Sequence, residues 1–341
     1  MASDSLELSV AALLATMERG REEFSLEQLS ASGNNRVYSL KCDAETLILK
    51  WYFHDAADTR DRLGAEYAFL EHAWSIGLRC IPQPLGKNES SYLAIYEFVE
   101  GRKLEAHEVD VGVMQQAAQF FASLNSLHSR EQASALPHAS EACFSLSEHF
   151  DILDARLARL MGMPVESDVD RYAAEFVSRL TAYWSDTKPR IIQGGAALEL
   201  SLDGALPAGE RCLSPSDFGF HNALLRPDGS VCFIDFEYAG WDDPAKAVGD
   251  FFSHPGVAVS HEQFEPFLAQ ALAPFNNAEQ MATRVRLLEP IAQVKWCCII
   301  LNEFLPAAAR RRNFANPVSD AIALKQRQLD KATQLFESLP N

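Results

Sequence analysis

The stretch that decides the fold is LSPSDFGFHNALLRPDGSVCFIDFEYAGWDDPAKAVGD, which runs from Leu213 to Asp250. It contains a D-x-x-x-x-N motif, formed by Asp217 and Asn222, and an IDFE motif that contains Asp235. Between the two motifs, the Asp-Gly pair at 228–229 separates two apolar runs, which is a strong signal for a β-hairpin turn. Because a hairpin brings its two ends together, we expect Asn222 and Asp235 to lie side by side, with Asp217 nearby.

These three side chains offer two carboxylates and one amide oxygen at a single point. Oxygen ligands of this kind suit a hard divalent cation, and a carboxylate beside the cation can orient a hydroxyl group. Phosphoryl transfer needs both of these functions, so the stretch predicts phosphoryl-transfer chemistry.

Length and composition are typical of a globular protein with two lobes. The chain has 341 residues, of which 48% are hydrophobic and 23% are charged. No apolar run approaches the roughly 20 residues that span a membrane, and the N-terminal sequence lacks the features of a secretory signal. The seven cysteines show no C-x-x-C spacing, which argues against a zinc site or a disulfide framework. We therefore expect a cytoplasmic protein with no membrane partner.

The net charge of the chain is −17. A surface of this sign repels nucleic acid and anionic lipid, so no nucleic-acid partner is expected. The charge is compatible with a cationic small-molecule partner, but general solubility is the favoured explanation. Either a monomer or a homodimer is compatible with the sequence.

Residues 1–100 are predicted to form a small, β-rich lobe. Asp58 or Thr59 can cap a helix that runs to about Ser75. The other predicted elements of this lobe are a helix over 5–23, β-rich runs within 24–53 and a strand over 92–99.

Residues 101–341 are predicted to form a larger, mainly helical lobe. Residues 129–147 and 195–212 lack a clear apolar pattern and are predicted to be loops. A cleft between two such lobes is a natural ligand site. Apolar periodicity predicts helices over 113–128, over two stretches within 148–185 that are broken at Met163-Pro164, and over about 261–272, 278–304 and 318–338.

Three features of the small lobe fit phosphate binding. The turn Gly33-Asn34-Asn35 between two strands can place backbone N–H groups against phosphates, although most such turns are plain hairpins. Lys50 lies inside the apolar strand LILKW, and Glu66 lies on the apolar face of the following helix. A strand lysine held by a helix glutamate can fix an amine against the α- and β-phosphates of a nucleotide.

Taken together, the motifs resemble those of the aminoglycoside phosphotransferase and choline kinase family, small-molecule kinases that share the protein-kinase fold. The resemblance covers about Leu26 to Pro255. It is carried, in order, by SGNNRVYSL, LILKWY, RLGAEYAFLEHAWSIGLRCIPQPL, AIYEFVEGRKL, AAQFFASLNSLH, SDFGFHN and FIDFEYAGWDDPAK. It implies an α+β, bilobal protein-kinase-like fold. The small antiparallel β-sheet lobe would carry one key helix, and the larger lobe would be mainly helical.

The resemblance also implies a hinge at 95–101, a catalytic loop at 214–222, a metal loop at 234–243 and acceptor-binding helices in the larger lobe. ATP and Mg²⁺ are the implied cofactors. Asp217 would orient the acceptor hydroxyl or accept its proton.

The remaining implied roles concern the nucleotide and its metal ion. Asn222 and Asp235 would hold Mg²⁺, and Lys50, positioned by Glu66, would contact the α- and β-phosphates. The other implied nucleotide contacts are the loop Gly33, Asn34 and Asn35 over the phosphates and the main chain of Glu97 and Val99 against the adenine edge.

The chain departs from the family pattern at two places, which puts it in a divergent branch. The family's His-Gly-Asp is Pro215-Ser216-Asp217 here, and the second Asp of its Asp-Pro-x-x-Asp motif is Ala247, with Asp250 as the nearest substitute. His128 and His221 are predicted to be packing or loop-supporting residues.

The predicted activity is ATP-dependent transfer of the γ-phosphate to a hydroxyl of a small molecule, which is an amino alcohol, a sugar or an aminoglycoside-like acceptor. The alternative is a catalytically weak or inactive, kinase-like, nucleotide-binding regulatory module. Retention of every implied site residue argues against that alternative. Two sets of residues are candidates for binding the acceptor. The aromatic residues Tyr238, Trp241 and Trp296 can cage a quaternary amine but are more typical of a core. The acidic residues Asp242, Asp243 and Asp250 can bind an aminoglycoside.

Overall fold

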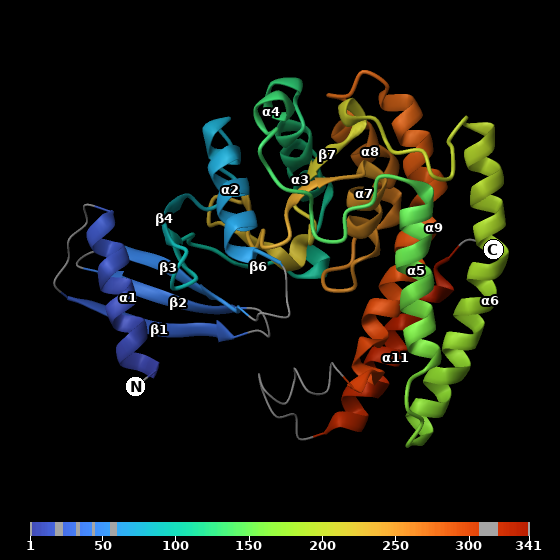
Figure 1. Cartoon of the computed structure of the whole chain (residues 1–341), viewed down its shortest axis with the longest axis horizontal. Helices are drawn as coiled ribbons and strands as arrows, with labels where there is room; N and C mark the ends of the chain where they lie inside the picture. The colour runs from blue at the N-terminus through green and yellow to red at the C-terminus, as the bar shows by residue number, and fades with distance from the viewer. Residues whose placement is uncertain are drawn as a thin grey trace.

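A five-stranded antiparallel sheet forms the small lobe, at the left of Figure 1. The computed structural model describes residues 2–17, 23–31, 35–42, 45–54, 60–306 and 320–339. Gly33, Asn34, Asp58 and Thr59 lie outside the described residues. The sheet has the strand order β1-β2-β3-β5-β4, with β1 (Phe24–Ala31), β2 (Asn35–Cys42), β3 (Glu45–Tyr52), β4 (Pro84–Asn88) and β5 (Leu93–Glu97).

Strand β4 was not predicted, because Pro82 and Pro84 are more typical of a connecting segment than of a strand. Pro84 is the first residue of the strand, and β4 lies at the edge of the sheet. A proline is tolerated there because an edge strand can do without one backbone donor.

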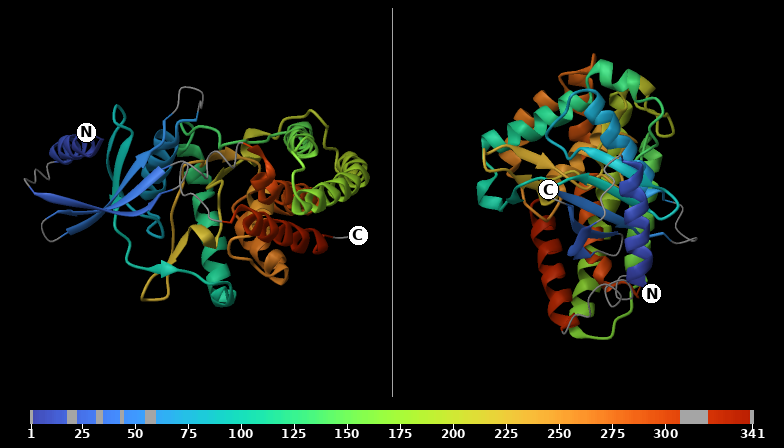
Figure 2. Two further views of the ribbon diagram at one scale, coloured as in Figure 1. Left: turned by 90° about the horizontal axis from the view of Figure 1, so that it is seen from below. Right: turned by 90° about the vertical axis from the view of Figure 1, so that its left-hand side faces the viewer.

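The two faces of the sheet pack against different helices. Helix α1 (Ala2–Thr16) covers the outer face (Figures 1 and 2). Helix α2 (Arg62–Ser75) packs on the inner side, and its N-terminus is capped by Asp61, whose carboxylate accepts a hydrogen bond of 2.8 Å from the N–H of Gly64. Side chains alternate between the faces of a strand. In β3, Leu47 and Leu49 therefore join the core under α1, and Lys50 faces α2.

The larger lobe is mainly helical. The longest of its described helices, α6, is drawn at the far right of Figure 1. Its helices are α3 (Val111–Leu124), α4 (Leu127–Gln132), α5 (Leu146–Met161), α6 (Asp168–Ala197), α7 (Pro244–Ser253), α8 (Phe264–Leu272), α9 (Ala278–Ile300) and α11 (Ala321–Glu337). Two small sheets join them, one of β6 (Arg102–Lys103), β8 (Ala223–Leu225) and β9 (Val231–Phe233), the other of β7 (Cys212–Ser214) and β10 (Gly240–Asp242).

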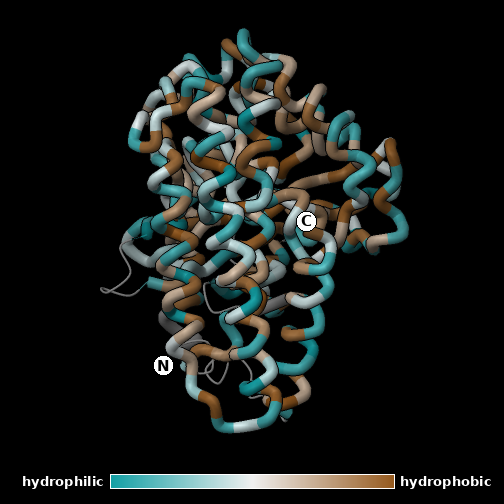
Figure 3. The backbone as a smooth tube through the Cα atoms, turned by 90° about the vertical axis from the view of Figure 1, so that its right-hand side faces the viewer, coloured by the Kyte–Doolittle hydropathy of each residue, from teal (hydrophilic) through white to brown (hydrophobic). Residues whose placement is uncertain are grey.

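The outer helices are amphipathic, since hydrophobic and hydrophilic residues alternate along their tubes in Figure 3. This periodicity explains why most of them could be predicted, including the break between α5 and α6 near Met163. Helices α4 and α7 were missed. Almost every residue of α7 is buried, including the charged residues Lys246 and Asp250, so the rule that places polar residues on an exposed helix face fails for this helix. Within the described residues, no helix combines the length and apolarity needed to cross a membrane.

The predicted β-hairpin is present, formed by β8 and β9. Its turn is closed by a hydrogen bond of 2.8 Å from the N–H of Arg226 to the carbonyl of Ser230, and Gly229 adopts a φ of +82°. A glycine is favoured at this position because it carries no Cβ. The fold class is therefore confirmed: a small antiparallel sheet lobe is joined to a larger, mainly helical lobe.

Candidate functional site

Lys50 is the centre of a buried ionic cluster between the two lobes. Its Nζ lies 2.9 and 2.8 Å from the two carboxylate oxygens of Glu66 and 2.7 Å from Oδ1 of Asp235. Lys50 and Glu66 are only 7% and 2% exposed. Burial alone would lower the pKa of Lys50, but the carboxylates of Asp235 and Glu66 outweigh it and raise the pKa. The lysine is therefore held as a cation.

Two further hydrogen bonds hold the carboxylate of Glu66 in place. Its Oε2 accepts a hydrogen bond of 2.7 Å from the hydroxyl of Tyr52, and its Oε1 accepts one of 3.3 Å from the N–H of Phe236. The ring of Phe236 stacks on Phe69 of α2 at a centroid distance of 4.9 Å. Helix α2 is thus attached both to the sheet and to the IDFE motif, so the motif and the lysine are positioned together.

Asp217 and Asn222 lie together on the other side of the site. The side-chain Nδ2 of Asn222 donates to the carbonyl of Asp217 at 3.1 Å and to its Oδ2 at 3.2 Å. The carbonyl of Asn222 accepts a hydrogen bond of 2.9 Å from the N–H of Ile234, the residue before Asp235. The hairpin therefore brings Asn222 beside Asp235 as its sequence predicted.

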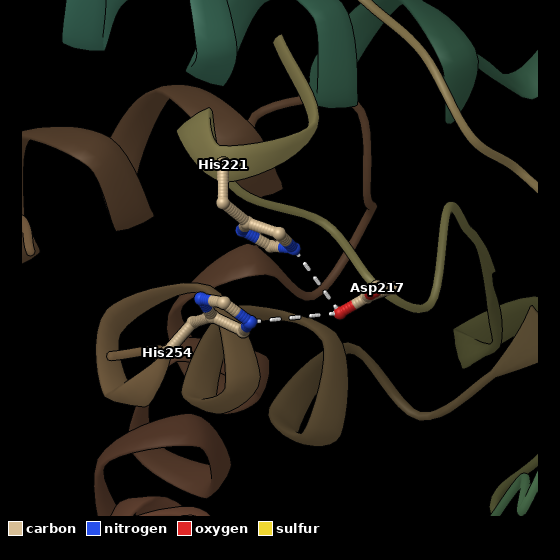
Figure 4. A group of neighbouring side chains, drawn as sticks. All are labelled: Asp217, His221 and His254. Atoms are coloured by element: carbon tan, nitrogen blue, oxygen red, sulfur yellow. Dashed lines mark ion pairs between the residues drawn. The ribbon is translucent and has the colours of Figure 1, made fainter. Parts of the chain in front are cut away.

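Two histidines face the carboxylate of Asp217 (Figure 4). The Nε2 atoms of His221 and His254 lie 3.3 and 3.8 Å from its Oδ1, and the two rings stack at a centroid distance of 3.4 Å with an angle of 7°. Burial alone would raise the pKa of Asp217, but His221 and His254 outweigh it and lower the pKa. Burial, with the neighbouring His221, lowers the pKa of His254 to about 4.

Sequence reasoning missed His254 and predicted only a packing or loop-supporting role for His221. His254 follows α7, and no spacing in the sequence links it to the D-x-x-x-x-N motif. The only available signal was the shared cleft, which requires the fold. His128, by contrast, is exposed on α4 and its Nε2 contacts Gln132.

Ser216 takes the place of the family's glycine and keeps a backbone conformation that suits glycine. Its φ is +66°, and its N–H donates to Oγ of Ser214 at 3.0 Å. Asp235 is also left-handed, with a φ of +71°. Such conformations cost energy in residues with a Cβ and are concentrated at functional sites.

Asn35 links the phosphate-loop segment to the IDFE motif. Its Nδ2 donates to Oε2 of Glu237 at 2.9 Å, and both side chains are buried. Burial, together with the charge of Asp235, raises the pKa of Glu237. Glu237 was not among the predicted site residues, although it belongs to the quoted motif.

The predicted hinge leads out of β5 into β6. The N–H of Glu97 is bonded to the carbonyl of Gln83 at 2.9 Å, so among its main-chain groups the carbonyl is the one that can face a ligand. Val99 is buried. From β6, Lys103 donates to the main-chain carbonyl of His221 at 2.8 Å, which ties β6 to the predicted catalytic loop.

The three aspartates predicted as acceptor ligands instead form buried ion pairs. Asp242 pairs with Lys246, and Asp250 accepts from Lys295 at 2.7 Å. Asp243 accepts from Arg284 and, at 3.1 Å, from His149. Asp243 and Asp250 thus link α7 to α9, whereas Asp242 pairs with Lys246 of α7. All three residues are at most 5% exposed, so they are engaged by buried cations and do not face an acceptor.

The three candidate cage aromatics do not converge either. The ring of Tyr238 lies 5.9 Å from the guanidinium carbons of both Arg60 and Arg62. Trp241 donates to the carbonyl of Ala133 at 3.1 Å, and Trp296 donates to Oδ1 of Asp250 at 2.9 Å. These contacts agree with the favoured interpretation of the three aromatics as structural residues, and the ring of Trp296 also lies edge-on to His254 at a centroid distance of 4.4 Å.

Solved structures with the same fold are kinases of small molecules. An ethanolamine kinase from Plasmodium vivax superposes with a TM-score of 0.56 at 13% identity, over 91% of this chain and 82% of that one. A choline kinase from Streptococcus pneumoniae gives 0.53 at 14% identity, over 97% and 99%. A spectinomycin phosphotransferase in complex with ADP and spectinomycin gives 0.54 at 11% identity, over 92% and 93%. At these identities the likeness shows the fold alone.

No curated protein sequence matches the chain at a significant level. The profile of the phosphotransferase enzyme family matches residues 25–288, a segment that contains both sides of the site described above. The chain is therefore a divergent member of the phosphotransferase enzyme family, with the fold of small-molecule kinases.

Proposed function

We propose that the protein transfers the γ-phosphate of ATP to a hydroxyl group of a small molecule, with Mg²⁺ as its metal cofactor. The observation that carries the proposal is that two clusters lie side by side, joined by the hydrogen bond from the N–H of Ile234 to the carbonyl of Asn222. The first is Lys50 with Glu66 and Asp235, and the second is Asp217 with Asn222. A fixed cation, carboxylate and amide ligands and a carboxylate for the hydroxyl are the parts that phosphoryl transfer needs.

The nucleotide would lie against the small lobe. Lys50 would contact the α- and β-phosphates, and its place is set by Glu66, which pairs with it through both carboxylate oxygens. The carbonyl of Glu97 and the N–H of Val99 would bind the adenine edge, while the loop that ends at Asn35 would cover the phosphates. These contacts act by positioning, which supplies much of the rate in this class of reaction.

The donor set fits Mg²⁺. The Nδ2 of Asn222 is engaged by Asp217, so the amide oxygen is the atom of that side chain left for a cation. Asp235 adds a carboxylate, and oxygen ligands are those that Mg²⁺ prefers. When bound, the ion would neutralise charge on the transferred phosphoryl group.

Asp217 would act on the acceptor. Its pKa is lowered, so the carboxylate is ionised at neutral pH and can accept a hydrogen bond from the acceptor hydroxyl. Asn222 holds Oδ2, which fixes the orientation of the group. This arrangement aligns the hydroxyl oxygen for in-line attack and gives its proton a place to go.

The experiment is a transfer assay with γ-labelled ATP, Mg²⁺ and a panel of hydroxyl compounds, combined with calorimetric measurement of ATP binding. Asp217→Asn should lower transfer by about 10²–10⁴-fold and leave the Kd of ATP nearly unchanged. Asp228→Asn is the matched control, because Asp228 lies in the turn of the same hairpin and bonds only to Ser230 among the contacts described.

Two outcomes would overturn the proposal. If ATP binds but no acceptor is labelled, the chain is a nucleotide-binding regulatory module. If Asp217→Asn transfers phosphate as fast as Asp228→Asn, then Asp217 does not act on the acceptor.

A further inference from the structure

The stacked pair of His221 and His254 is a built part of the cleft. Gly219 and Gly256 make room for it. A Cβ on Gly219 would lie 2.7 Å from Nδ1 of His221, and one on Gly256 would lie 2.8 Å from both the Cβ of His221 and the Cε1 of His254. Since real Cβ atoms do not approach so closely, side chains at these two positions would displace the rings from Asp217.

The ring nitrogens of the pair keep hydrogen-bonding capacity that the described part of the protein does not satisfy. Neither ring nitrogen of His221 meets hydrogen-bond geometry with a partner in the described part of the chain. The Nδ1 of His254 accepts a hydrogen bond of 3.0 Å from the N–H of Gly256. The neutral ring therefore carries its proton on Nε2, which points at Asp217 from 3.8 Å, beyond hydrogen-bond distance.

This tautomer argues against a metal ion at the same three residues. Asp217, His221 and His254 have potential ligand atoms within 4.8 Å of one another. A metal at Nε2 of His254 would need the lone pair of that atom, and the proton displaced to Nδ1 would face the N–H of Gly256. A ligand that accepts a hydrogen bond from Nε2–H avoids this conflict.

A hydroxyl oxygen has the right size and chemistry to lie between Nε2 of His254 and Oδ1 of Asp217. An oxygen about 2.8 Å from each of two atoms can bridge a separation of 3.8 Å, and a hydroxyl both donates and accepts. The reacting hydroxyl would bond to Oδ2 of Asp217, the oxygen that Asn222 orients, so a hydroxyl that bridges Oδ1 and Nε2 of His254 would be a second one, on a neighbouring carbon.

The charges around this point do not favour a cationic acceptor. The candidate aspartates are committed to buried ion pairs. On the hinge side of the histidines lies the ammonium group of Lys103, bonded to the carbonyl of His221.

From these observations we propose that His254, held by the stacked ring of His221, forms a subsite for the hydroxyl that neighbours the reacting one, and that the acceptor is an uncharged polyol of the sugar class. This assignment rests on the proposed function and specifies its acceptor. His254 acts as a specificity-determining residue, His221 as its positioning residue, and Asp217 acts on the reacting hydroxyl.

The test pairs each compound that has adjacent hydroxyls with an analogue that has none: methyl β-D-ribofuranoside with its 2-deoxy analogue, and glycerol with 1,3-propanediol. Choline, ethanolamine and spectinomycin are the cationic probes. The full-length wild-type protein should label a diol at least about tenfold more efficiently, by kcat/KM, than its deoxy partner.

His254→Ala should raise the KM for the diol and bring the ratio between diol and deoxy analogue close to one. His254→Gln keeps an N–H donor and should restore part of that ratio, which a merely structural role would not do. His128→Ala is the control, because His128 is exposed on α4 and outside the cleft. A thermal-shift measurement of each variant with ATP and Mg²⁺ reports whether it is folded.

The outcomes separate the subsite from the proposed function. Transfer to choline or spectinomycin but to none of the sugars would refute the polyol subsite and leave the phosphotransferase assignment intact. An unchanged diol-to-deoxy ratio in folded His254→Ala would refute the role of the histidines. If no acceptor is labelled, the proposed function fails, and the subsite is then tested by thermal shift alone. Stabilisation by a diol but not by its deoxy analogue, lost in His254→Ala, would support the subsite, and its absence would refute it.

Discussion

Asp243 offers the sharpest test of how the larger lobe is held together. It is fully buried, accepts hydrogen bonds from Arg284 and from His149, and caps α7 through the N–H of Ala245 at 2.8 Å. Asp243→Ala would leave the guanidinium of Arg284, which is 8% exposed, buried without this carboxylate. Removing one partner of a buried ion pair costs about 3–5 kcal/mol, and loss of a helix cap costs about 1 kcal/mol.

The total expected loss is therefore about 4–6 kcal/mol in the free energy of unfolding. The measurement is urea unfolding followed by far-UV circular dichroism, whose signal comes mostly from the helices. Glu265→Ala is the matched control, because Glu265 also pairs with an arginine of α9, Arg286, but the two side chains are 60% and 46% exposed. An exposed pair contributes only about 0–1 kcal/mol, so the control should lose little.

The stability lost in Asp243→Ala should depend on pH in a defined direction. Burial alone would raise the pKa of Asp243, but Arg284 and His149 outweigh it and lower the pKa well below its usual range. A carboxyl with a lowered pKa stabilises the folded state above its unfolded-state pKa of about 3.9, and this contribution fades as the pH falls below that value. The difference between wild type and Asp243→Ala should shrink in the same range. Equal losses for Asp243→Ala and Glu265→Ala at pH 7 would refute the reasoning.

Three further results are expected at the site. Lys50→Met should raise the Kd of ATP by roughly 10–100-fold in calorimetry, since a hydrogen bond to a charged group is worth about 1.5–3 kcal/mol; an unchanged Kd would contradict its phosphate-binding role. Ser216→Gly should raise the free energy of unfolding by up to about 1 kcal/mol in urea unfolding, because it relieves a left-handed backbone; a loss of stability would show that no strain is stored there. Because the pKa of Asp217 is lowered, the pH profile of kcat should show no acidic limb from this carboxyl above about pH 4, and a limb assigned to it above pH 5 would contradict its proposed ionised state.

The parts of the site that could be predicted are those that local pattern encodes. The Asp-Gly turn fixed the hairpin and so the meeting of Asn222 with Asp235. The alternation of β3 placed Lys50 on the face opposite Leu49, toward the helix that carries Glu66.

The parts that could not be predicted depend on partners far apart in the sequence. Asp243 was interpreted as an acceptor ligand because Arg284, which neutralises it, arrives only with α9. His254 has no motif of its own and reaches Asp217 only because α7 folds back beside the catalytic loop. A carboxylate is indistinguishable in sequence whether it faces a ligand or a buried cation.

Helix α1 covers one face of the small sheet, and this cover has a consequence for aggregation. Val10, Leu13 and Leu14 of α1 are at most 1% exposed and pack on the strand residues Leu40, Leu47, Leu49, Leu93 and Ile95. If residues 2–17 detached, a flat apolar surface would meet the solvent next to β1, an edge strand with unpaired backbone groups. Surfaces of this kind recruit further strands from other chains. Helix α1 thus shields this apolar face of the sheet from contact with other chains.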